Sequence, residues 1–144
     1  MVSTPASSSA PGRAAAVRST SRPYGALVGI TSLGILLQGL WAGVLMAQED
    51  PAARDTWASV HQRGAEITLL LALVALVVVL ARLRERRDLV VGTTVLVVLL
   101  ALEYVVGLLW GDAEVRGMAV VHVPLAMLLM AVAVWLPLRH RPRA

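Results

Sequence analysis

The sequence contains no cysteine and no lysine, and charged residues make up only 15% of its 144 residues. The lack of cysteine excludes disulfides, thiolate metal sites, iron–sulfur clusters and the covalent attachment of a c-type haem. Histidine, carboxylate and amide side chains are therefore the remaining candidates for chemistry. All 13 basic residues are arginine, a bias that fits GC-rich coding better than any mechanism.

Motifs of soluble enzymes are also missing. No glycine-rich phosphate loop follows a strand, and neither G-x-S-x-G nor H-E-x-x-H occurs in the chain. The segments between the hydrophobic stretches are too short to build a separate catalytic domain. The sequence therefore favours a protein that is not an enzyme, without deciding the point.

Hydrophobic residues, by contrast, are abundant: they make up 58% of the chain, and its mean hydropathy is +0.74. This lies well above the apolar share of an ordinary soluble domain. Four hydrophobic segments are each near or above the ~20 residues that cross a bilayer, and in lipid each must be a helix. We predict these spans at residues 24–47, 57–81, 89–110 and 116–138.

The spans form one transmembrane domain, residues 23–139, between two polar tails. Residues 1–22 are rich in Ser, Ala, Pro and Arg without apolar periodicity, which predicts a disordered cytoplasmic tail. Residues 140–144 are predicted to form a short C-terminal cytoplasmic tail. Short connections make successive helices antiparallel neighbours. The predicted fold is therefore all-α, an up-down-up-down four-helix membrane bundle.

The placement of arginine predicts how this bundle is oriented. Arginines gather in both tails and in the connection at residues 82–88, whereas the other two connections are mostly acidic. The positive-inside rule then puts both termini in the cytoplasm of a multi-pass cell-membrane protein. The net charge of the chain is +4. The anionic partner of its basic residues is expected to be lipid headgroups rather than nucleic acid. A membrane-protein partner or a second copy of the chain stays open.

Each predicted helix carries one polar group in the outer third of the bilayer. At a rise of about 1.5 Å per residue, these groups lie roughly 22–26 Å from the cytoplasmic ends of their helices. They are Gln38, Glu66, Glu103 and His122. Ionisable residues inside a membrane usually face the bundle interior and pair.

One interpretation is a cofactor-free structural or accessory protein, whose polar layer only locks the bundle. Proton transport through Glu103 and His122 is weaker, since no inverted repeat is evident.

The histidines offer another interpretation. His61 and His122 lie near the same end of two helices that run in the same direction, as axial ligation of haem b by two histidines requires. Arg63 and Arg116 are candidates to pair with the haem propionates. His61 lies about 6 Å further out than His122, an offset that helix tilt or a kink at Pro124 would have to absorb. Such a haem would serve electron transfer or haem handling.

The histidine-bearing helices in one four-helix half of haem A synthase resemble two segments of this chain, "SVHQRGAEITLLLALVALVV" and "AVVHVPLAMLLMAVAVW". The resemblance implies that His61 and His122 are haem ligands in a pocket open to the outer face. That family has a glutamate and an arginine where this chain has Ala58 and Gln62, and only one of its two halves is present, so oxidation of haem O by this chain alone is not implied. The chain also resembles small uncharacterised bacterial four-helix membrane proteins that carry the same two histidines.

Overall fold

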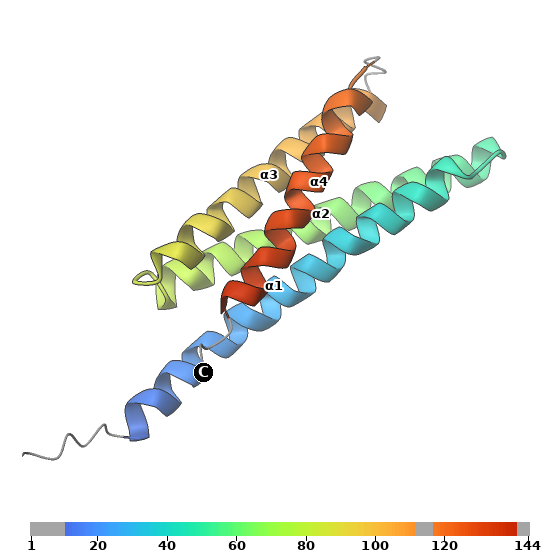
Figure 1. The fold of residues 1–144 in the computed structure, drawn as a ribbon. Helices are drawn as coiled ribbons and strands as arrows, with labels where there is room; N and C mark the ends of the chain where they lie inside the picture. The colour runs from blue at the N-terminus through green and yellow to red at the C-terminus, as the bar shows by residue number, and fades with distance from the viewer. Residues whose placement is uncertain (1–10, 112–116, 141–144) are drawn as a thin grey trace, which may run out of the picture.

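The computed structural model describes residues 11–111 and 117–140. Within these ranges the chain forms four α-helices and no strand (Figure 1). The helices are α1 (Pro11–Met46), α2 (Pro51–Arg82), α3 (Arg87–Gly111) and α4 (Ala119–His140). Each contains a stretch long and apolar enough to cross a membrane. The predicted all-α, four-helix membrane architecture is confirmed.

Three helices begin before the predicted spans, α3 by only two residues and α1 and α2 by more. α1 begins at Pro11, inside the segment expected to be a tail, because the run "RAAAV" has high helix propensity. Its candidate membrane span begins only at Arg22. α2 begins at Pro51 because the Asp50 side chain accepts a hydrogen bond from the backbone N–H of Ala53 at 2.9 Å. An aspartate cap followed by proline is a favoured helix start.

The four helices form a ring in which each packs against two others. α1 and α3 both contact α2 and α4, and across the described residues α2 and α4 do not pack directly on each other. The α1–α2 and α3–α4 hairpins diverge toward their connecting loops (Figure 1). We call that end of the bundle the loop end. The opposite end, with the α2–α3 connection and the end of α4, is the terminal end.

The apolar core lies toward the terminal end, where the hairpins are in closest contact. The largest fully buried apolar side chains come from all four helices: Tyr24, Val28, Val79, Leu89, Leu96 and Leu136. On α2 the buried positions are mostly small, including Gly64, Thr68 and Ala72. Small residues let helix backbones approach closely, which is the main source of packing energy where lipid replaces water.

A buried hydrogen bond joins α1 to α3 within this core. The hydroxyls of Tyr24 and Thr93 are 2.7 Å apart. Thr93 donates its own hydrogen to the backbone carbonyl of Leu89, so the tyrosine is the donor in the pair. The ring of His140, which the sequence placed in the C-terminal tail, ends α4 and lies edge-on to Tyr24 at 5.3 Å. The terminal end is thus held together by contacts among three helices.

Large apolar side chains also cover the outside of the bundle. Leu40, Leu70, Val91 and Met127, one from each helix, are all 60% or more exposed. In water, exposed apolar surface on this scale would drive aggregation, whereas in a bilayer it contacts lipid. The chain is therefore a multi-pass integral membrane protein. Which end of the bundle faces the cytoplasm stays a prediction from the arginines.

Candidate functional site

A carboxylate and an imidazole meet inside the bundle, in the half nearer the loop end. Glu103 on α3 is only 8% exposed, and its Oε2 lies 3.0 Å from Nδ1 of His122 on α4. The two are at ion-pair distance, but the contact is not aligned as a hydrogen bond. Among the described residues neither Glu103 oxygen nor His122 Nδ1 has a hydrogen-bond partner. Because buried polar atoms usually have one, this pair retains unused hydrogen-bonding capacity.

The surroundings of His122 are provided by the same face of α3. The Trp110 ring lies edge-on to the imidazole, with 5.6 Å between ring centroids. Gly107 leaves room beside the ring, since a Cβ added there would lie 3.7 Å from the imidazole Cε1. Glu103, Gly107 and Trp110 are spaced i, i+4 and i+7, which puts them on one helix face. That spacing was the signal in the sequence that could have added Gly107 and Trp110 to the site.

The second imidazole is held by a side chain from the first helix. With the Gln38 amide oriented to satisfy both of its ends, its nitrogen donates to His61 Nδ1 and to the His61 carbonyl oxygen, each at 2.9 Å. Its oxygen accepts from the backbone N–H of Ala65, also at 2.9 Å. Gln38 is therefore bonded to α2 rather than to Glu103.

The two histidines lie within electrostatic range of each other. The His61 side chain interacts electrostatically with both His122 and Glu103, although the sequence placed it one turn further out than His122. The two hairpins cross at an angle (Figure 1). Two residues at the same distance from the ends of their helices therefore lie at different levels of the bundle. In each hairpin, a polar side chain on the first helix faces Nδ1 of a histidine on the second. Both partners face Nδ1, and neither of them bonds to Nε2, the other nitrogen of each ring.

Glu66 does not join this cluster. Its Oε2 lies 2.8 Å from a guanidinium nitrogen of Arg63, one turn earlier on α2, and its Oε1 accepts from the Tyr104 hydroxyl at 3.1 Å. The Arg63 side chain is 77% exposed. Tyr104, which the sequence analysis did not single out, thus links α3 to α2 beside the histidines. Arg116 lies outside the described residues.

The described residues form no site at which protein side chains alone would hold a metal ion. Among the residues that the structure describes, no three His, Asp or Glu side chains are grouped so as to hold a metal ion. A haem iron is a different case, because its porphyrin supplies four ligands and the protein supplies only the axial ones. No protein-family model matches the chain, and no match to it is found among curated proteins or solved structures.

Proposed function

We propose that this membrane protein binds one haem b between His61 and His122, for electron transfer or haem handling near the loop end of the bundle. The observation that carries the proposal is the arrangement of the two imidazoles. Each comes from a different hairpin, each has its Nδ1 facing a polar side chain, and the two rings lie within electrostatic range of each other. A bound haem would supply reversible one-electron chemistry at its iron.

The residues present fit the group. Histidines that ligate a metal usually present one ring nitrogen to it, while the other donates to a carboxylate, a carbonyl or water. Glu103 is placed to become such a carboxylate, because its Oε2 lies 3.0 Å from His122 Nδ1 and has no hydrogen-bond partner among the described residues. His61 needs a proton on Nδ1 to ligate through Nε2. Gln38 can then accept a hydrogen bond from Nδ1 with its amide oxygen once the amide is reversed, a change that gives up its bonds to the His61 carbonyl and to Ala65.

Two features of the backbone around the histidines support the proposal. α2 and α4 face each other across the ring without packing directly within the described ranges, and Gly107 leaves space beside the His122 ring. Arg63 is a candidate to pair with a propionate because its side chain is largely exposed, although it already contacts Glu66. Arg116 is proposed for the same role on its sequence position alone.

An absorption spectrum tests this proposal directly. Protein purified in detergent from haem-supplied cells is expected to show a Soret band and, when reduced, the sharp α band of low-spin haem b. His61→Ala and His122→Ala should each abolish the low-spin spectrum. His140→Ala is the matched control, since the third histidine lies at the terminal end and should leave the spectrum intact. Colourless wild-type protein, or an unchanged spectrum in both site variants, would overturn the proposal.

A second function is supported by a different observation. Both ends of the Gln38 amide are satisfied within the bundle, and Glu66 has two partners, so most of the polar layer is complete without a cofactor. On that basis the protein would be a structural or accessory membrane protein whose polar contacts fix the helix arrangement. The same variants distinguish the two functions, because here they change only stability and no wild-type absorbance exists to be lost.

A further inference from the structure

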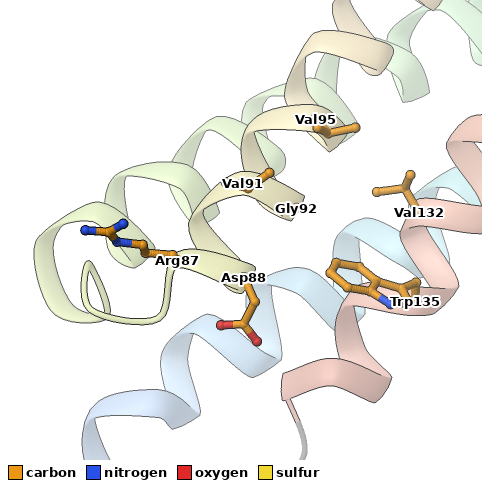
Figure 2. A pocket seen from close by; sticks show the side chains of 7 residues that line it. All are labelled: Arg87, Asp88, Val91, Gly92, Val95, Val132 and Trp135. Carbon is orange, nitrogen blue, oxygen red and sulfur yellow. The ribbon is translucent and has the colours of Figure 1, made fainter.

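An apolar groove lies between α3 and α4 at the terminal end, away from the histidines. Its volume is about 470 Å³. The floor is Gly92, where α4 comes so close that an added Cβ would lie 2.6 Å from the Trp135 ring. The walls are formed by Val91, Val95, Val132 and Trp135 (Figure 2). The groove is thus apolar and faces lipid along the outside of the bundle.

The mouth of the groove, at the first turn of α3, is charged. Asp88 lies there (Figure 2) and contacts two arginines: Arg86 Nε is 3.1 Å and Arg139 Nε is 3.2 Å from its carboxylate oxygens. Two guanidinium groups on one carboxylate leave a net positive charge. Arg87 is also among the lining residues, with its guanidinium extending from the start of α3 away from Trp135 (Figure 2), and no carboxylate of the described residues lies within ion-pair distance of it. The mouth is therefore suited to an anion.

An apolar groove with a cationic mouth is complementary to an amphipathic anion. We propose that this groove binds one anionic phospholipid, with its phosphate at Arg87 and the upper part of an acyl chain along the valines. Val95 lies seven residues beyond Asp88, which is roughly 10 Å along the helix. The groove therefore reaches from the headgroup level into the acyl region, and it is bounded by Trp135, a residue type favoured at membrane interfaces.

The charge around the mouth supports an anionic rather than a zwitterionic lipid. Residues 82–88 together with Arg139 contain five arginines against Glu85 and Asp88. Basic groups between helices at a membrane surface attract anionic headgroups, each arginine contributing a modest share. The predicted orientation puts this end at the cytoplasmic leaflet, where anionic lipids are concentrated. This site is independent of the proposed haem site, because it shares no residue with it.

Native mass spectrometry of the delipidated full-length protein in detergent tests the proposal. Phosphatidylglycerol and phosphatidylcholine with identical acyl chains are added in turn, and the fraction with one bound lipid is measured. Phosphatidylglycerol is expected to bind several-fold more tightly. Arg87→Gln should weaken it roughly fivefold, the effect of one arginine near a membrane surface, and should leave phosphatidylcholine unchanged. Arg84→Gln, an exposed arginine outside the groove, is the matched control: it should weaken phosphatidylglycerol much less than Arg87→Gln does and should leave phosphatidylcholine unchanged.

A second pair of variants tests the apolar part. Val132→Trp fills the groove and should reduce single-lipid binding of both lipids, whereas Val134→Trp, on an exposed part of α4 outside the groove, should not. Glycerol phosphate without acyl chains should fail to compete. Equal affinity for the two lipids, equal losses in Arg87→Gln and Arg84→Gln, no loss in Val132→Trp, or competition by glycerol phosphate would overturn the proposal.

Discussion

Glu103 Oε2 lies 3.0 Å from Nδ1 of His122, and this contact between α3 and α4 is buried in the half of the bundle where the hairpins diverge. It places an acid and a base from two successive helices side by side inside a membrane protein. A polar pair of this kind fixes the register of two helices, and it also decides how the imidazole is oriented.

Removing the carboxylate should loosen the α3–α4 hairpin. Glu103→Leu leaves His122 Nδ1 without its partner, and polar contacts between membrane helices contribute about 0.6 kcal/mol on average and up to ~1.7 kcal/mol. We expect a loss of free energy of unfolding in this range, measured by titration of mixed micelles with SDS. Glu103→Gln keeps an acceptor for Nδ1 and should retain most of the stability. A Leu variant as stable as the wild type would contradict this prediction.

A methyl group at Gly64 should separate α1 from α2. An added Cβ would collide with the Trp41 ring and with the Gln38 amide, and overpacking of this kind costs about 1–3 kcal/mol. Gly64→Ala is therefore expected to lower stability and to disturb the Gln38–His61 contact. Gly39 is the control, because an added Cβ there meets nothing within 4 Å. Gly39→Ala should be neutral or gain about 0.5–1 kcal/mol from helix propensity. Equal effects at the two glycines would argue against this packing.

The Tyr24–Thr93 hydrogen bond can be measured by a double-mutant cycle. Tyr24→Phe and Thr93→Val each remove one side of a buried 2.7 Å contact, and such a bond contributes about 0.5–1.5 kcal/mol. The double variant should lose less than the sum of the two single losses. Thr94→Val, one residue along on an exposed face, provides the control for losing a threonine hydroxyl. Strict additivity of Tyr24→Phe and Thr93→Val would indicate no coupling.

The absence of cysteine makes the orientation easy to test. Glu49 in the α1–α2 connection and Glu85 in the α2–α3 connection are both exposed, and either can be changed to a single cysteine in a chain that has none. If both termini are cytoplasmic, a membrane-impermeant maleimide should label Glu49→Cys in intact cells. Glu85→Cys should react only after the cells are permeabilised. The reverse pattern would invert the topology predicted from the arginines.

The number, type and approximate limits of the helices could be predicted because lipid allows few alternatives. A run of about 20 apolar residues must form a helix when no solvent is present to satisfy its backbone. The polar capping contact that starts α2 at Pro51 lies outside the hydrophobic run, so hydropathy alone placed that start too late. The same limitation hid the extension of α1 back to Pro11.

The presence of one polar group on each helix could be read from the sequence, whereas most of their partners could not. Gln38, Glu103 and His122 each had several possible partners, because a helix that is apolar on nearly every face gives no signal for which side points inward. Only the packing order of the helices assigned Gln38 to His61 and Glu103 to His122. The packing also brought Tyr104 to Glu66, whereas Arg63, three residues earlier on α2, is a local partner that the sequence already offered.

By itself, the sequence determined that this is a four-helix membrane protein with two histidines toward one end, because hydrophobic length and helix rise are local properties. The tertiary structure decided that the hairpins cross, that both imidazoles reach the same region, and that Gly92 and Trp135 form a groove on the outside. Those features depend on how each helix is rotated and tilted against its neighbours. Rotation and tilt follow from close packing among side chains far apart in the chain, which no local pattern records.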